Sequence, residues 1–274
     1  MKVAALQMTS GPDVAANLAQ AGTLLEEAAR GGAQLAVLPE NFSFMGLKDA
    51  DKRAVAEPDG AGPVQNFLAA SARRWKLWIV GGTTPLQGGA DGRVAAASLV
   101  YDADGRRVAR YDKIHLFDVD LPGRAESYRE SANVAPGATA AVLDTPVGRL
   151  GLSVCYDVRF PELYRQLSAA GAQLLSVPSA FTAPTGRAHW ETLLRARAIE
   201  NLCYVIAPAQ SGIHPSGRET YGDSMIVDYW GRILSRVPRG RGCAVAEVDL
   251  VRQMSVRAGF PALAHRMLGA GAHS

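Results

Sequence analysis

Three side chains with complementary chemistry follow short apolar or β-rich runs in this sequence: Cys155, Glu40 and Lys113. The ends of strands are where side chains from distant parts of a chain meet at one edge of a sheet. Taken alone, such a cysteine is ordinarily a small buried hydrophobe, and such a glutamate or lysine is ordinarily solvated. A thiol, a carboxylate and an amine at three strand ends together favour nucleophilic catalysis.

The chemistry of the three groups is mutually dependent. A thiol has a pKa of about 8.5 and is mostly protonated at neutral pH, so Cys155 needs a base or a cation to act as a nucleophile. Glu40 can accept the thiol proton, and the compact charge of Lys113 can stabilise an oxyanion without exchanging a proton. The set therefore predicts acyl transfer, and it differs from a papain-like pair of cysteine and histidine.

Four motifs surround these residues in chain order: LAVLPENF, RYDKIHLFDVDLPG, GLSVCYDVRFPELY and PSAFTAPTGRAHWETLLRARAIENLCYV. They resemble the carbon-nitrogen hydrolase (nitrilase) superfamily over nearly the whole chain. The resemblance implies a catalytic triad of Glu40, Lys113 and Cys155. It also implies a second glutamate after the lysine motif, which corresponds to Glu130 in YRESANVAPG. We expect Glu130 to orient the amide nitrogen and Lys113 without transferring a proton.

Three segments look most like the deaminated glutathione amidase branch: CYDVRFPELY, SAFTAPTGRAHWETLLRARAIE and AQSGIHPSGRETYGDSMIVDYWG. This resemblance implies that the enzyme cleaves an amide bearing an α-keto acid through a thioester, giving 2-oxoglutarate and cysteinylglycine. An ω-amidase acting on 2-oxoglutaramate is the nearest alternative, and a nitrilase is another. The complete triad disfavours a binding protein without chemistry. Asp223 and Tyr229 depart from the family pattern, where His and Pro are frequent, which affects the substrate assignment only.

The expected substrate-binding residues lie in loops after two predicted strands: Tyr156, Arg159, Phe181 and Thr182. The backbone N–H of Tyr156 is expected to stabilise the oxyanion. Arg159 suits a bidentate pair with a substrate carboxylate, but an ion pair to Asp157 or Glu162 is an equally ordinary role for it. Phe181 and Thr182 are expected to line the pocket.

Three histidines are weaker candidates. His115 is two residues from Lys113, so a strand would place both on one face, yet we interpret it as a structural hydrogen-bonding residue. His189 stands in a predicted helix, where packing and capping are the ordinary roles, and His214 lies in a loop. None of the three is required by the predicted reaction.

Size and charge exclude several classes of protein. At 274 residues and 48% hydrophobic content the chain suffices for one large domain or two small ones, and evenly spread apolar runs favour a single domain over residues 1–274. The 29 basic and 26 acidic residues leave a net charge of only +3. The Arg-rich stretch 236–241 is interpreted as a solvated loop, so no nucleic acid partner is expected. The small-residue tail 269–274 is expected to fray.

Cysteine usage indicates a reduced, metal-free protein. Cys155, Cys203 and Cys243 form no CxxC pair, and no histidine stands at metal-ligand spacing. We expect no disulfide, no metal and no organic cofactor. The start of the chain does not resemble a signal peptide, and no apolar run approaches a membrane span. We therefore expect a cytoplasmic enzyme with a small-molecule amide substrate and no membrane partner. The resemblance implies a homodimer or a larger homo-oligomer.

Strands and helices alternate along the chain to position these residues. Residues 3–8, 13–30 and 34–39 predict a strand, an amphipathic helix and a strand. Further helices are expected at 62–75, 161–170 and 189–201, and further strands at 77–81, 174–178 and 203–207. Turns at 102–105 and 229–232 predict two hairpins. This mixture predicts an α/β fold with two stacked mixed sheets, and the resemblance implies a four-layer α-β-β-α sandwich.

Overall fold

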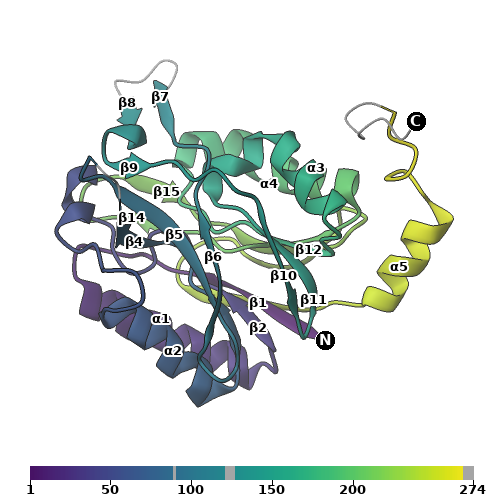
Figure 1. The fold of residues 1–274 in the computed structure, drawn as a ribbon, viewed down its shortest axis with the longest axis horizontal. Coiled ribbons are helices and arrows are strands. Elements are labelled where there is room, and N and C mark those ends of the chain that lie inside the picture. The colour runs from purple at the N-terminus through teal and green to yellow at the C-terminus, as the bar shows by residue number, and fades with distance from the viewer. Residues whose placement is uncertain (89–90, 121–126, 268–274) are drawn as a thin grey trace.

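The computed structural model of the chain describes residues 1–88, 91–120 and 127–267; the tail 269–274, expected to fray, lies outside the described residues. Two mixed sheets stack face to face, and helices cover both outer faces (Figure 1). The predicted four-layer α-β-β-α sandwich is confirmed.

Five α-helices belong to the described part of the chain: α1 (Val14–Arg30), α2 (Pro63–Trp75), α3 (Pro161–Ala169), α4 (Ala183–Asn201) and α5 (Leu250–Gly259). The first sheet has the spatial order β18 (Gly242–Glu247), β1 (Lys2–Gln7), β2 (Leu35–Val37), β3 (Trp78–Val80), β5 (Val94–Tyr101), β4 (Thr84–Gln87), with β6 (Arg107–Asp112) and β9 (Val134–Ala135) also paired to β5. The second has the order β10 (Ala141–Thr145), β11 (Gly148–Leu152), β12 (Leu174–Ser176), β13 (Tyr204–Ala207), β16 (Ser224–Val227), β17 (Ile233–Val237). Two short ribbons pair β7 (Asp118–Asp120) with β8 (Ser127–Arg129) and β14 (Ser211–Ile213) with β15 (Glu219–Tyr221).

Each sheet contains three neighbouring parallel strands between antiparallel ones. These are β1, β2 and β3 in the first sheet and β11, β12 and β13 in the second. The carboxyl ends of parallel strands share one edge of a sheet, so the loops after β2, β11 and β12 gather there. Glu40 and Cys155 lie in these loops, Lys113 directly follows β6, and Glu130 directly follows β8.

Alternating apolar residues hold the layers together. In β1, Val3 and Ala5 belong to the core between the sheets, whereas Ala4 and Leu6 pack in the core beneath α1. The start of α1 is capped by the side chain of Asp13, which accepts a hydrogen bond from Ala16 N–H at 3.0 Å. The apolar face of α1 is thereby set against the first sheet.

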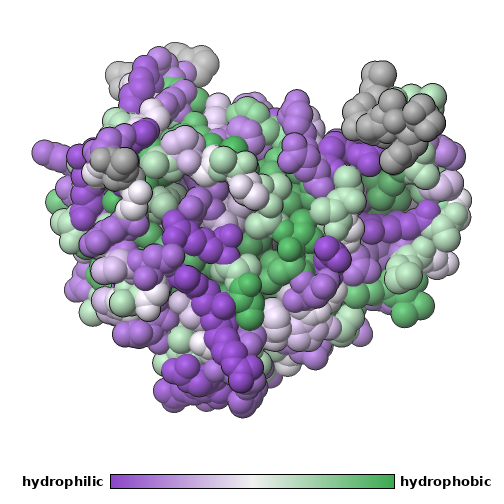
Figure 2. Space-filling view, in the orientation of Figure 1, coloured by the Kyte–Doolittle hydropathy of each residue, from purple (hydrophilic) through white to green (hydrophobic). Residues whose placement is uncertain are grey.

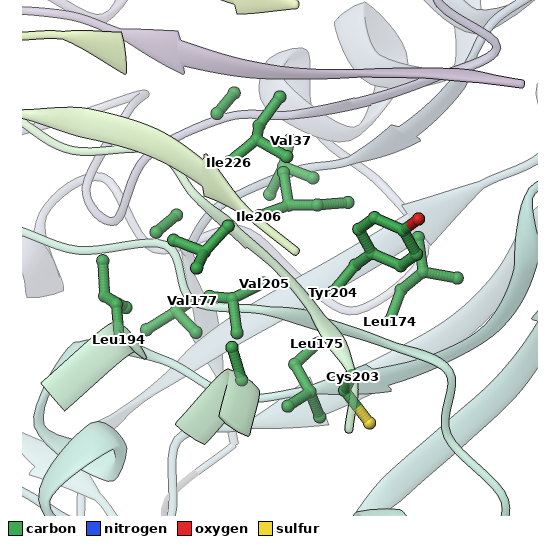
Figure 3. Close-up of a cluster of buried hydrophobic side chains, with 14 of the residues drawn as sticks. Val37, Leu174, Leu175, Val177, Leu194, Cys203, Tyr204, Val205, Ile206 and Ile226 are labelled. Carbon is green, nitrogen blue, oxygen red and sulfur yellow. The ribbon is translucent and has the colours of Figure 1, made fainter. Parts of the chain in front are cut away.

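The second sheet uses the same alternation. In β13, Val205 points toward Leu194 of α4, whereas Ile206 points toward Val37 of the first sheet (Figure 3). Because one strand supplies side chains to two layers of the core, the sheet is buried on both faces.

Both predicted hairpins are present. β5 and β6 are joined by a turn in which Asp102 N–H donates to Arg106 C=O at 3.0 Å, and β16 and β17 by a turn in which Asp228 N–H donates to Arg232 C=O at 2.9 Å. Two predictions were wrong. The last long helix, α4, begins at Ala183, because Pro184 fits a first helical turn. The Arg-rich stretch forms an exposed loop over residues 238–241 as predicted, but Arg236 belongs to β17.

The surface mixes hydrophilic and hydrophobic residues, with hydrophobic positions exposed on α5 (Figure 2). None of the helices within the described ranges has both the length and the apolar character needed to cross a membrane.

Candidate active site

Glu40 lies just beyond β2, at the edge of the first sheet. The residue is buried, with 4% exposure, and both carboxylate oxygens accept hydrogen bonds. Oε1 accepts from the Lys113 ammonium at 2.8 Å, and Oε2 accepts from the Ala180 N–H at 2.8 Å. Because Ala180 follows β12 of the second sheet, Glu40 connects the two sheets at this edge.

Lys113 directly follows β6, and its ammonium lies between two carboxylates. Its Nζ is 2.8 Å from Glu40 and 2.8 Å from the nearer oxygen of Glu130. Glu130 begins a short 3₁₀ turn after β8 and also accepts a hydrogen bond from Phe117 N–H at 2.7 Å. The structure therefore brings Glu130 into direct contact with Lys113.

Cys155 begins a 3₁₀ turn just beyond β11 and has a φ of +48°. This left-handed region is uncommon for residues other than glycine and asparagine, and such strain concentrates at functional sites. The Cys155 N–H donates to Pro178 C=O at 2.9 Å, which ties the turn to the loop after β12. The sharp turn directs the chain away from the strand and leaves the thiol on the wall of a cavity that it shares with Glu40 and Lys113.

Asp157 connects the segment that carries the lysine to the turn that carries the thiol. Its Oδ2 accepts from the Tyr111 hydroxyl at 2.7 Å and from Val154 N–H at 2.8 Å. Its Oδ1 accepts from His115 N–H at 3.1 Å and lies 2.7 Å from Nδ1 of the same residue. Tyr111 and His115 flank Lys113, and Val154 precedes the cysteine, so one fully buried carboxylate holds both segments in register.

The charges of the site follow from burial and neighbouring groups. Burial raises the pKa of the Cys155 thiol, Glu40 raises it further, and Lys113 opposes both. Burial disfavours the Lys113 ammonium, but Glu130 and Glu40 outweigh this effect and raise its pKa well above the ordinary value. Burial also disfavours the Glu130 carboxylate, yet Lys113 and Lys52 together lower its pKa. The resting site therefore holds a protonated thiol beside an ammonium and an ionised Glu130.

The cavity at the thiol is narrow, with a volume of about 30 Å³. All the predicted site residues except Arg159 line it: Glu40, Lys113, Glu130, Cys155, Tyr156, Phe181 and Thr182. The other lining residues are Asn41, Asp49, Lys52, Phe117, Tyr128, Ala180, Thr185 and Arg218. The structure thus brings together side chains that lie far apart in the sequence.

Arg159 packs behind the aromatic part of this wall. Its guanidinium carbon lies 5.9 Å from the ring centroid of Tyr156 and 5.3 Å from that of Phe181, and its Nη1 is 3.4 Å from His189 Nδ1. Neither of the two acidic neighbours considered above forms an ion pair with it in the described part of the chain. Cation–π packing replaces the ion-pair interpretation of Arg159, and its contact with a substrate carboxylate stays a prediction.

Sequence reasoning missed two cations of the cavity wall, Lys52 and Arg218. Lys52 belongs to the 3₁₀ helix Asp49–Arg53, and Arg218 lies just before β15. Neither position belongs to a periodic pattern that predicts where a side chain points. For Arg218, the only sequence signal is a basic residue inside the matched motif AQSGIHPSGRETYG.

The three histidines lie outside the cavity lining. His115 hydrogen-bonds as described above, and His189 contacts Arg159. His214 is buried, with Nδ1 2.8 Å from Ser10 C=O and Nε2 2.7 Å from Thr220 Oγ1, and burial lowers its pKa. All three therefore take structural hydrogen-bonding positions.

The two departures from the family pattern also lie away from the cavity. Asp223 is buried and its Oδ2 accepts from Arg236 Nη2 at 2.7 Å. The ring of Tyr229 packs edge-on against Tyr204, with centroids 5.3 Å apart. Both residues support the second sheet.

Cys155, Cys203 and Cys243 are free thiols. Among residues 1–88, 91–120 and 127–267, no group of three or more His, Cys, Asp or Glu side chains is arranged to hold a metal ion.

Comparisons with known proteins agree with this geometry. Residues 2–258 match the carbon-nitrogen hydrolase family. A deaminated glutathione amidase from Synechocystis sp. is 46% identical over 272 residues, which cover 96% of this chain and 97% of that protein. A deaminated glutathione amidase from Yersinia enterocolitica is 43% identical over 264 residues, which cover 96% of this chain and 92% of that protein.

A solved structure has the same fold. The NitFhit protein of C. elegans matches with a TM-score of 0.89 and 40% sequence identity. The match covers 97% of this chain and 65% of that chain, so the present chain spans just under two thirds of that protein. The chain therefore belongs to the carbon-nitrogen hydrolase family and is a hydrolase of carbon–nitrogen bonds other than peptide bonds.

Proposed function

We propose that the protein is a cysteine-dependent amidase that works through a thioester on Cys155. The observation that carries this proposal is the placement of the Cys155 thiol, the Glu40 carboxylate and the Lys113 ammonium on the wall of one buried cavity. These groups supply a nucleophile, a proton carrier and a positive charge for an oxyanion, which are the requirements of acyl transfer.

The first step couples proton transfer to attack. Since the Cys155 thiol is protonated at rest, it loses its proton to Glu40 as the sulfur bonds to the amide carbonyl carbon. The electron pair of the carbonyl bond moves to oxygen, which gives a tetrahedral oxyanion. Glu40 suits this role because its charge and hydrogen bonding act directly on the thiol.

Two N–H donors are available to stabilise the proposed oxyanion. Lys113 has three N–H donors, and two are directed to Glu40 and Glu130, which leaves one for the substrate. The Tyr156 N–H has no acceptor within the described residues, whereas the Cys155 N–H is taken by Pro178. Each donor of this kind contributes roughly 3–4 kcal/mol to transition-state stabilisation.

The oxyanion then collapses and the carbon–nitrogen bond breaks. Glu40 returns its proton to the leaving nitrogen, and the acyl group remains on Cys155 as a thioester. A water molecule gives a proton to Glu40 and its oxygen bonds to the thioester carbon. The carbon–sulfur bond then breaks, Glu40 returns the proton to the leaving sulfur, and the carboxylic acid is released. Glu130 holds Lys113 throughout and transfers no proton.

We infer that the substrate is deaminated glutathione, cleaved to 2-oxoglutarate and cysteinylglycine. Two similar proteins are named for this activity, and both match over nearly the whole of this chain. The narrow cavity and the cations Lys52 and Arg218 on its wall suit a small acyl group attached to a longer, acidic molecule.

A product assay with deaminated glutathione, 2-oxoglutaramate, a neutral primary amide and a nitrile tests this proposal. We expect the highest kcat/KM for deaminated glutathione, because binding of the cysteinylglycine part can position the amide against the thiol. A higher value for 2-oxoglutaramate would make the protein an ω-amidase, and a higher value for the nitrile would make it a nitrilase. Purified Cys155→Ala protein is the control for contaminating hydrolases.

Assembly and location complete the proposal. We infer a homodimer or larger homo-oligomer, which is supported by the exposed apolar side chains of Val251 and Met254 on α5 and of Phe260 just after it. Light scattering coupled to gel filtration measures the oligomeric state, and a monomer would contradict this inference.

A cytoplasmic location is supported by the free cysteines, because a nucleophilic thiol persists in a reducing compartment.

A further inference from the structure

The cavity at the thiol adjoins a wider groove that the reaction steps above do not use. The groove has a volume of about 270 Å³, against about 30 Å³ for the cavity. Five residues line both: Asn41, Asp49, Lys52, Tyr128 and Arg218. Because the inner cavity is small, the larger part of an extended amide must pass these shared residues and lie in the groove.

The inner cavity on its own disfavours an anionic substrate. Glu40 and Glu130 are two carboxylates, and Lys113 is the single ammonium between them. Like charges in a desolvated site repel unless cations compensate them. Besides Lys113, the cations of the described cavity wall are Lys52 and Arg218. A substrate carboxylate at this site must therefore lie near one or both of them.

Arg218 is held in position but retains unused donors. Its Nη2 donates to Ala180 C=O at 2.8 Å, and its guanidinium carbon lies 5.2 Å from the ring centroid of Tyr128. Its Nε is buried without a hydrogen-bond partner, and no carboxylate of the described ranges forms an ion pair with it. A fixed guanidinium with unsatisfied donors is suited to bind a carboxylate, since little rotational freedom remains to be lost.

Lys52 adds a second positive charge to the same wall. It lies on the 3₁₀ helix Asp49–Arg53 and forms no ion pair within residues 1–88, 91–120 and 127–267. Its charge reaches the site, because it acts on the ionisation of Glu130. Asp49 is the one acidic residue that lines both spaces, so the two basic residues outnumber it there.

We propose that Arg218 and Lys52 form a subsite for a carboxylate of the amide substrate, with Arg218 as the specificity-determining residue. The proposal rests on the proposed amidase function and concerns the selectivity of the same site. Deaminated glutathione carries one carboxylate on its α-keto acyl part and one on its dipeptide leaving group. The test therefore replaces each carboxylate separately by a neutral carboxamide.

Isothermal titration in a Cys155→Ala background measures binding without turnover. The ligands are deaminated glutathione, its α-keto carboxamide and its glycinamide form. Arg218→Gln is expected to raise the Kd of deaminated glutathione about 10- to 100-fold, and Lys52→Gln is expected to raise it less. One of the two carboxamides lacks the carboxylate that Arg218 binds. Arg218→Gln should weaken binding of that carboxamide far less than binding of the other two ligands. The carboxamide that is least affected therefore identifies the carboxylate that Arg218 binds.

Arg106→Gln is the matched control, because Arg106 is an exposed arginine just before β6, at the opposite end of that strand from Lys113, and its removal should leave every Kd unchanged. Arg218→Lys keeps the charge and should recover part of the affinity. An equal loss for all three ligands, or no loss, overturns the subsite, because a purely structural role of Arg218 affects all ligands alike.

The binding assay also separates the two proposals. Absence of amide hydrolysis by the unmodified enzyme would contradict the proposed function. The change in Kd on Arg218→Gln for each ligand would still be measured, and it tests the subsite alone. If circular dichroism shows that Arg218→Gln is unfolded, the same binding measurements are made with Arg218→Lys and Lys52→Gln. Unchanged Kd values for both of these variants would overturn the subsite.

Discussion

Glu130 lies as close to the Lys113 ammonium as Glu40 does, with 2.8 Å between Nζ and the nearest oxygen in both pairs. The two carboxylates nevertheless have different surroundings. Glu40 also binds the Ala180 N–H and acts on the ionisation of the thiol, whereas Glu130 binds the Phe117 N–H. These surroundings support the proposed proton transfer by Glu40 and the proposed orientation of the lysine by Glu130.

This difference predicts unequal effects of the same substitution. Glu40→Gln should abolish turnover, because an amide keeps a hydrogen bond but cannot accept the thiol proton. Glu130→Gln should lower kcat by roughly 10²-fold and leave the shape of the pH–rate profile unchanged, since it weakens only the positioning of Lys113. Steady-state kinetics across the pH range measure both. Normal turnover by Glu40→Gln would require another base.

Lys113→Arg should fail nearly as badly as Lys113→Ala, with kcat/KM reduced by about 10²- to 10³-fold. The arginine keeps a positive charge but is larger and planar, so it cannot direct one donor to each of Glu40, Glu130 and the oxyanion. Thermal unfolding of both variants is measured beside the kinetics. This comparison separates lost catalysis from lost stability, because Lys113→Ala also leaves two buried carboxylates unpaired. Activity near that of the unmodified enzyme in Lys113→Arg would reduce the role of Lys113 to general electrostatics.

The thiol of Cys155 should remain protonated up to at least about pH 9. Burial and Glu40 raise its pKa well above the ordinary range of a thiol, so the neutral form dominates at every lower pH. Thiolate absorbance near the ultraviolet edge, taken as the difference between unmodified and Cys155→Ala protein, should show no ionisation step below that pH. A step near neutrality would mean that the enzyme stores a thiolate and would contradict proton transfer to Glu40 during attack.

Asp157→Asn should lower the free energy of unfolding by about 2–3 kcal/mol. Asparagine replaces one acceptor oxygen by a donor, which leaves Val154 N–H or His115 N–H without a partner in a buried position. Urea denaturation measures the change, and kcat should fall as well because the Asp157 contacts link the lysine and cysteine segments. Asp144→Asn, at a carboxylate whose side chain is 84% exposed, is the control. A loss no larger than that of the control would exclude the linking role.

The fold was largely predictable because its signals are local. The Asp-Gly turn predicts the β5–β6 hairpin, and the alternating strands and helices predict an α/β protein, while motif order added the four-layer arrangement. The start of α4 was misplaced, since Pro184 was not counted as part of a helix. Arg236 was misassigned because its ion pair to Asp223 is formed only in the folded chain.

The site was predictable where a residue stands in a matched motif beside a strand, as for Glu40, Lys113 and Cys155. Loop residues carry no such signal. For Arg159 the sequence left a substrate pair and an ion pair equally open, and the guanidinium packs over the Phe181 ring, whereas Arg218 lines the cavity from a loop far along the chain. Such directions depend on tertiary contacts that spacing alone does not contain.

The most direct test of the account is mass spectrometry of the intact protein after acid quenching during turnover. We expect a mass increase equal to the acyl part of the substrate, located on the peptide that contains Cys155. Cys203→Ala and Cys243→Ala proteins should show the same adduct and retain activity, and Cys155→Ala should show neither. An adduct on another residue, or hydrolysis by Cys155→Ala at the rate of the unmodified enzyme, would contradict the thioester mechanism.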